Sequence, residues 1–260
     1  MTAEPTPLPF HDYGGYGPHV VGIHGHFGTS LSFSALARAL DGRIRFTAPD
    51  QRGHGAAGPG AGPDVDSYLK LLEAFLEYHV SGPVVLFGHS MGGTHAIMLA
   101  GRRPDLVSAL VIEDQPMVVS PEILDVSRLP VRAPTFLGLA AALRDIGLED
   151  PSYFMLGAVR DQQGWGLAFD LQDLMASQHE LVGDYSEAWK NLHVPILLLR
   201  GEDSFLLSRE AATEMVDVQP RARLMEFAGC SHWVHDDDPA GVADALVEFA
   251  TSLPRLSEGQ

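Results

Sequence analysis

The chain of 260 residues is 45% apolar and 20% charged, the balance of a globular protein that can bury a full core. Its formal net charge of −17 argues against nucleic acid and anionic membrane surfaces as partners, and no apolar run reaches the roughly 18 residues that a membrane-spanning helix needs. The single cysteine, Cys230, excludes an internal disulfide, and with a start that lacks a basic and apolar leader it predicts a cytoplasmic protein.

Up to residue 116, short apolar runs alternate with runs in which apolar residues recur at helical spacing. The first 18 residues are rich in Pro, Gly and Tyr and predict one short edge strand or hairpin. The strands predicted after them are 19–23, 43–47, 83–87 and 109–112, and the helices are 33–40, 68–79 and 94–100. Strands that alternate with helices predict an α/β fold, a mainly parallel central sheet with helices on both faces.

The pattern changes after residue 116. From 117 to 192 only helix-like segments are predicted, near 133–147, 151–160, 167–181 and 185. Strands then resume at 194–199 and 223–227, and the chain is predicted to end with a helix over 239–251. We therefore expect residues 1–116 and 193–260 to form the α/β core, with 117–192 inserted as a helical cap, or lid.

The chemistry is expected to centre on the turn at 88–92, Gly-His-Ser-Met-Gly, which joins a predicted strand to a predicted helix. G-x-S-x-G in that context is a nucleophile elbow, which holds a serine at a tight, strained bend beyond the carboxyl end of the sheet. Ser90 is the predicted nucleophile, and the backbone N–H of Met91 would face the reacting carbonyl. An incidental serine in a glycine-rich turn is the alternative, so the rest of the chain has to decide.

Two further loops supply what such a serine needs. Residues 24–28, His-Gly-His-Phe-Gly, follow an early strand, where the backbone N–H of His26 could join that of Met91 in an oxyanion hole. The general base must follow the last strand, and His232 in the loop 229–235 lies five residues beyond Phe227. His235 is the alternative base.

The loops 24–28, 50–55, 88–93 and 229–235 together resemble the recurring signatures of the α/β-hydrolase family, over about residues 19 to 252. The likeness is to small serine esterases and thioesterases, which also carry Gly-x-x-Ser after their penultimate strand, as at 201–204 here. The spacing of the family motif favours His232 as the base. It also implies that the acid of the triad lies in one of two places.

Asp114 and Asp203 are the two candidates for that acid. In many relatives the acid follows the penultimate strand, three residues after a glycine or slightly later, but here those positions hold Ser204 and Phe205. Another branch carries its acid after the strand that follows the nucleophile helix, where Asp114 lies 24 residues beyond Ser90. We favour Asp114. Glu113 is a lesser rival, because strand alternation would point it the other way.

The resemblance implies hydrolysis of a carboxylic ester or thioester of a small apolar or aromatic substrate through an acyl-enzyme, without a metal or an organic cofactor. Phe27 and two aromatic residues of the cap, Phe136 and Trp165, are predicted to line the acyl pocket. A lactonase or C–C bond hydrolase would use the same triad, and some members of the fold are non-hydrolytic binding or scaffold proteins. The expected partner is a small-molecule substrate; the sequence does not determine the physiological substrate or the oligomeric state.

Overall fold

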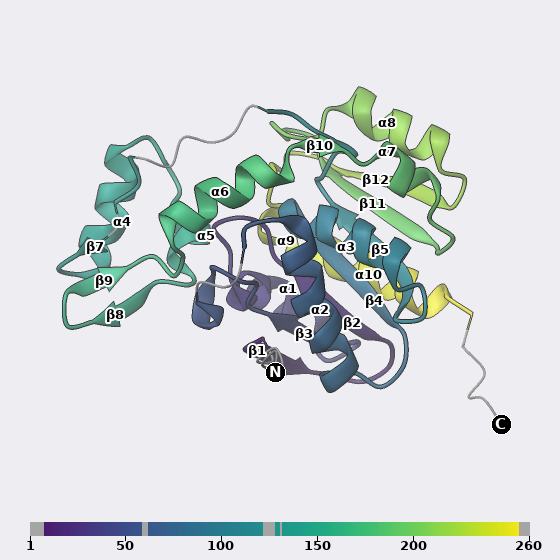
Figure 1. The fold of residues 1–260 in the computed structure, drawn as a ribbon, viewed down its shortest axis with the longest axis horizontal. Coiled ribbons are helices and arrows are strands. Elements are labelled where there is room, and N and C mark those ends of the chain that lie inside the picture. The colour runs from purple at the N-terminus through teal and green to yellow at the C-terminus, as the bar shows by residue number, and fades with distance from the viewer. Residues whose placement is uncertain (1–7, 59–61, 122–127, 131, 255–260) are drawn as a thin grey trace.

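A seven-stranded sheet forms the centre of the computed structural model, which describes residues 8–58, 62–121, 128–130 and 132–254 (Figure 1). Its strands are β1 (Phe10–Gly14), β2 (His19–Ile23), β3 (Arg45–Pro49), β4 (Val84–His89), β5 (Val107–Glu113), β11 (Ile196–Gly201) and β12 (Ala222–Phe227). They lie in the order β1-β3-β2-β4-β5-β11-β12. The edge strand β1 runs antiparallel to β3, and the other neighbours run parallel.

Helices cover both faces because successive side chains of each strand point to opposite sides. In β4, Val85 and Phe87 pack in one apolar cluster, and Val84 and Leu86 pack in the other. The first cluster is completed by α1 (Ser34–Leu40), α9 (Val234–Asp237) and α10 (Pro239–Ser252). The second is completed by α2 (Val65–His79), α3 (Met91–Arg102) and α8 (Arg209–Val218). The predicted α/β fold is confirmed.

Between β5 and β11 the chain leaves the sheet, in the stretch that we call the cap (residues 117–192). Its helices are α4 (Phe136–Asp145), α5 (Ser152–Met155), α6 (Leu171–Leu181) and α7 (Ser186–Lys190). It also contains the short strands β6 (Val118–Val119), β7 (Arg132–Ala133), β8 (Val159–Asp161), β9 (Gly164–Gly166) and β10 (Gly183–Asp184). The prediction of helices alone was therefore wrong. Residues 122–127 and 131 of the predicted cap lie outside the described residues.

The cap strands form two small antiparallel sheets, β10-β6 and β7-β9-β8. Each of these strands has only two or three residues, too few for an alternating pattern to be recognised in the sequence. Gly164 explains how β9 fits: its φ is +114°, and a Cβ there would lie 2.4 Å from the carbonyl oxygen of Ala133. A pairing that depends on one such close approach is set by tertiary contact, not by local propensity.

The cap packs on the core through an apolar cluster that includes Phe27, Tyr153 and Phe154. Figure 1 shows α6 between the core sheet and the outer part of the cap, where α4 and β7–β9 lie. Trp189 of α7 is fully buried in the core cluster beside α2 and α3, although the sequence assigned residues up to 192 to the cap. The cap boundary itself stays a prediction.

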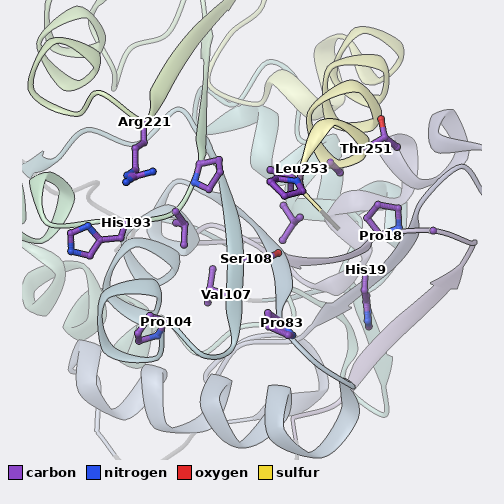
Figure 2. Close-up of a pocket in the computed structure, with 16 residues that line it drawn as sticks. Pro18, His19, Pro83, Pro104, Val107, Ser108, His193, Arg221, Thr251 and Leu253 are labelled. Carbon is purple, nitrogen blue, oxygen red and sulfur yellow. The ribbon is translucent and has the colours of Figure 1, made fainter. Parts of the chain in front are cut away.

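A cavity of about 830 Å³ opens at the amino ends of the strands, between His19, Val107 and the end of α10 at Leu253 (Figure 2). The strand β4 separates this edge from Ser90 by its six residues, or roughly 20 Å. This cavity therefore does not serve the predicted nucleophile. Among the described helices, none combines the length and the apolarity needed to cross a membrane.

Candidate active site

Ser90 occupies the turn between β4 and α3 with φ 53° and ψ −125°. Left-handed backbone is strained for a residue with a side chain, and such strain gathers at functional sites. Close packing enforces the turn, since a Cβ on Gly92 would lie 2.1 Å from the carbonyl oxygen of Ile23. Ser90 N–H donates to the carbonyl of Glu113 at 3.0 Å, which ties the turn to the neighbouring strand. The geometry is that of the predicted elbow.

The 24–28 loop lies directly against this serine. A Cβ on Gly25 would lie 2.9 Å from Ser90 Cβ, so only glycine allows the approach. His26, the predicted oxyanion donor, is the next residue. Met91 is the first residue of α3, and the N–H groups of a first helical turn have no acceptor within the helix. Phe27 also has positive φ, at 66°, so the loop is strained where it passes the serine.

The 50–55 motif explains how the 24–28 loop is held. Gln51 N–H donates to His24 Nε2 at 2.9 Å, so the proton of that imidazole sits on Nδ1, which donates to the Gly25 carbonyl at 2.8 Å. The Gln51 side-chain amide donates to the His24 carbonyl at 2.5 Å, and its oxygen accepts from His95 Nδ1 at 2.7 Å. His24 therefore orders the 24–28 loop through both of its ring nitrogens.

Asp114 and His232 form a hydrogen bond of 2.7 Å between Oδ2 and Nδ1. An ionised carboxylate only accepts, so Nδ1 carries the proton and Nε2 keeps a lone pair that can act as a base. Asp114 is fully buried, and its φ of 49° lies in the left-handed region that Asp tolerates better than most residues. Gly201 packs against the residue before His232, since a Cβ on Gly201 would lie 1.9 Å from the Ser231 carbonyl oxygen.

Ser204 is a partner of Asp114 whose role the sequence did not reveal. Its hydroxyl donates to Asp114 Oδ2 at 2.5 Å and accepts from the N–H groups of Leu206 and Leu207, each at 3.0 Å. Asp203 is exposed, and its N–H donates to the carbonyl of Cys230. The structure thus brings Asp114, not Asp203, to His232. The only sequence signal was the Gly-x-x-Ser pattern, which puts a hydroxyl where other relatives have the acid.

Glu113 points the other way along the strand, as alternation required, and meets His235. Its Oε1 accepts from His235 Nδ1 at 2.7 Å and from His235 N–H at 3.2 Å, and both side chains are fully buried. Burial alone would lower the pKa of His235, but the Glu113 carboxylate outweighs it and raises that pKa above its usual value. His235 therefore belongs to a second pair and does not occupy the place of the base.

A model of the Alpha/beta hydrolase family matches residues 20–245. The chain belongs to this family. Among curated proteins it is 26% identical over 250 residues to sn-1-specific diacylglycerol lipase ABHD11 of Mus musculus, covering 89% of this chain and 80% of the lipase. It is 27% identical over 247 residues to 2-(acetamidomethylene)succinate hydrolase of Mesorhizobium japonicum, covering 90% and 88%.

The solved structure of E-2-(acetamidomethylene)succinate hydrolase superposes on this chain with a TM-score of 0.83 at 23% identity, covering 94% of this chain and 95% of the other. A likeness at this identity speaks for the fold alone. Both of these relatives, found by sequence, are hydrolases, and together with the family assignment they support hydrolase activity for this chain.

In this α/β hydrolase, the aromatic side chains of Phe205 and Trp233 lie beside the buried imidazole of His232. The ring centre of Phe205 lies 4.9 Å from the imidazole and 6.0 Å from Trp233, and Phe205 is 63% exposed. A large apolar side chain left in water beside a candidate base is available to contact a ligand. Cys230 is no rival nucleophile, because burial and nearby acids raise the pKa of its thiol to about 11.

The three residues predicted to bind substrate lie in two places. Phe27 of the 24–28 loop is buried, and its ring centre lies 5.0 Å from that of Phe154 and 5.6 Å from that of Phe169. Phe136 and Trp165 pack against each other, 5.0 Å apart, in the outer part of the cap. A substrate contact of Phe27, Phe136 or Trp165 stays a prediction.

The cap also reaches the 24–28 loop through a polar contact. His26 Nε2 lies 2.9 Å from the hydroxyl of Ser177 on α6, and that hydroxyl donates to the Leu174 carbonyl at 3.0 Å. Because the hydroxyl proton is used, Nε2 of His26 is the donor. The side chain of His26 is therefore bound to the cap, and its backbone N–H remains the group that could serve an oxyanion.

Proposed function

We propose that the chain is a serine hydrolase that cleaves a carboxylic ester or thioester through an acyl-enzyme, with Ser90, Asp114 and His232 as its triad. The observation that carries the proposal is the 2.7 Å hydrogen bond from His232 Nδ1 to Asp114, because it leaves Nε2 as a base. The strained backbone of Ser90, next to the Gly25 loop, supports the same assignment. Asp203 is not part of the proposed triad.

In the proposed reaction His232 Nε2 takes the Ser90 hydroxyl proton as Oγ attacks the acyl carbon. The carbonyl oxygen gains negative charge, which the N–H groups of His26 and Met91 stabilise; each donor of this kind is typically worth about 3 kcal/mol. His232 then gives its proton to the departing alcohol or thiol. Water, deprotonated by the same imidazole, hydrolyses the acyl-enzyme and restores Ser90.

The surroundings support an apolar substrate. A leaving group that takes its proton from His232 must sit beside that ring, and the ring centre of Phe205, a largely exposed side chain, is 4.9 Å from the imidazole centre. Phe27 of the 24–28 loop packs against Phe154 of the cap, and these rings support an apolar or aromatic acyl group. We therefore propose an apolar group on both sides of the scissile bond. The diacylglycerol lipase among the relatives is named for an ester of that general kind.

The test is labelling with a fluorophosphonate, followed by a panel of p-nitrophenyl esters, acyl thioesters and lactones. Stoichiometric modification of Ser90 and ester or thioester turnover are expected. Ser90→Ala should lose both while it stays folded, with a loss of several decades in kcat. Absence of labelling in folded wild type would favour a binding protein. If Ser90 is labelled but only lactones or C–C bonds are cleaved, the proposed triad is supported and the proposed ester or thioester substrate is wrong.

A further inference from the structure

A second carboxylate–histidine pair lies one residue away from the proposed triad pair. Glu113 ends β5 and Asp114 follows it, and they bind His235 and His232, which are three residues apart, His235 in α9 and His232 in the loop before it. Side chains of successive residues point in opposite directions at the end of a strand, so Asp114 meets His232 and Glu113 meets His235. Nothing in the proposed reaction requires Glu113 or His235 to touch the substrate.

Glu113 binds both the backbone and the imidazole ring of His235. Glu113 Oε1 accepts both the Nδ1–H and the backbone N–H of His235. His89, the β4 residue in register with Glu113, contributes a further contact: its Nε2 donates to the carbonyl oxygen of His232 at 3.1 Å. The ends of two adjacent strands thus hold the loop at His232 Nδ1, at the His232 carbonyl and at His235.

Stability alone does not explain a pair in this position. Both Glu113 and His235 are fully buried, and removing charges from water costs free energy that their attraction only partly returns. Apolar residues of the same volume often stabilise a protein as well as a buried ion pair does. Such pairs are better suited to selecting one arrangement of the chain, and here the arrangement that they would select contains His232.

We propose that Glu113 and His235 are positioning residues that hold the His232 loop so that Nδ1 meets Asp114 and Nε2 faces Ser90. The inference rests on the proposed triad. In this arrangement Glu113 and His235 support the residues around His232 from behind, and His89 of β4 supports them through the His232 carbonyl. The ring of His235 packs against Phe33 at 5.2 Å between centres and against His89 at 4.9 Å, so the pair has little freedom to rearrange.

The same residues form the one cluster in the described chain whose donors could suit a metal ion. His89, Glu113 and His235 each offer one ligand atom, all within 4.8 Å of one another. Two histidines and a glutamate are a set of residues that can bind zinc. The direct Glu113–His235 hydrogen bond favours the ion pair, and the metal becomes an outcome of the test.

The test compares three folded variants with wild type. Glu113→Met with His235→Leu removes the pair but keeps an apolar filling, and Glu113→Gln keeps the shape and one acceptor oxygen. Glu73→Gln is the control, because it removes a carboxylate that binds Arg102 on the remote α2–α3 surface. The readouts are the second-order rate of fluorophosphonate labelling, the far-downfield proton resonance of His232 Nδ1–H, and Tm.

The double variant should label about 10- to 100-fold more slowly than wild type, since misplacing a catalytic group by about an ångström has that effect. Its His232 resonance should broaden or shift. Glu113→Gln should lose less than the double variant, and Glu73→Gln should label at the wild-type rate. Should the double variant fail to fold, Glu113→Gln decides alone, with a loss of about three- to tenfold expected.

Labelling within about twofold of wild type in the folded double variant, with an unchanged His232 resonance, would overturn the proposal. One equivalent of zinc in purified wild type that is lost in Glu113→Gln would also overturn it. If wild type itself does not label, the serine mechanism has failed. In that case the His232 resonance still reports whether the pair positions the imidazole, so the two failures are distinguishable.

Discussion

Exchanging the two candidate acids one at a time tests the site most directly. Asp114→Asn replaces a buried carboxylate that accepts from His232 Nδ1 at 2.7 Å and from Ser204 Oγ at 2.5 Å. If the amide nitrogen faces His232, Nδ1 must give up its proton and Nε2 is no longer a base. If the amide oxygen faces His232, the tautomer survives but the charge that stabilises the imidazolium is lost.

The expected loss in kcat lies between about 10² and 10⁴, or about 3 to 5.5 kcal/mol of transition-state stabilisation. Asp203→Asn is the matched control, because Asp203 is exposed and lies next to the segment that Ser204 anchors. Its kcat should change by less than about threefold. Hydrolysis of a p-nitrophenyl ester and the rate of fluorophosphonate labelling should fall together in Asp114→Asn, with Tm recorded to exclude unfolding.

Two outcomes would refute this reasoning. A large loss confined to Asp203→Asn would mean that the acid comes from the loop after β11, as in the commoner arrangement. A loss below about tenfold in folded Asp114→Asn would mean that the hydrogen bond does not orient the base. Ser204→Ala adds a graded test, because a hydrogen bond to a charged group is worth about 1.5–3 kcal/mol and its loss leaves the Asp114 carboxylate less well fixed.

Three other predictions concern the cap, the leaving group and acid stability. Smaller residues at Phe136 or Trp165 should change acyl chain-length preference more than Tm, and a changed Tm with unchanged substrate ranking would make these residues structural. Phe205→Ala should lower kcat/KM about three- to tenfold for phenyl relative to ethyl esters of one acid, as an aromatic contact implies, and an unchanged ratio would contradict the contact with the leaving group. Burial lowers the pKa of His95 to about 3, so the unfolded state binds this proton first as pH falls below about 6.5. The group should cost about 2 kcal/mol of folding stability by pH 5, and His95→Gln should flatten urea-melt stability against pH over that range; an unchanged slope would exclude it.

The sequence was sufficient for the features that repeat along the chain or recur in a family. The alternation of strands and helices predicted the parallel sheet, because apolar periodicity reports burial directly. Four loop motifs at strand ends predicted which residues would meet, because the carboxyl ends of parallel strands share one edge. The pairing of His232 with Asp114 was anticipated from the resemblance to relatives that carry the acid after the strand following the nucleophile helix.

Other features could not be predicted because they depend on contacts between distant segments. The strands β7, β8 and β9 exist only because three short segments meet in the cap, and none has a pattern of its own. Ser204 looked like a replaced acid, and only the structure brings its hydroxyl to Asp114 Oδ2. The pairing of Glu113 with His235 was not foreseen, although alternation had already excluded Glu113 from the place that Asp114 takes.

Backbone strain connects these observations. Within the described chain four residues other than glycine have positive φ, and three of them, Phe27, Ser90 and Asp114, lie at the site. Ser90 and Asp114 each directly follow a register pair, His89 and Glu113, on adjacent strands. At both strand ends the chain turns into the left-handed region at the residue whose side chain is needed. Such turns cost of order 1–3 kcal/mol each and persist only where their surroundings fix them. The Ser90 N–H bond to the Glu113 carbonyl and the Asp114 N–H bond to the Leu199 carbonyl are two such constraints. The sheet that gives the fold its stability therefore also fixes the proposed nucleophile and acid in place.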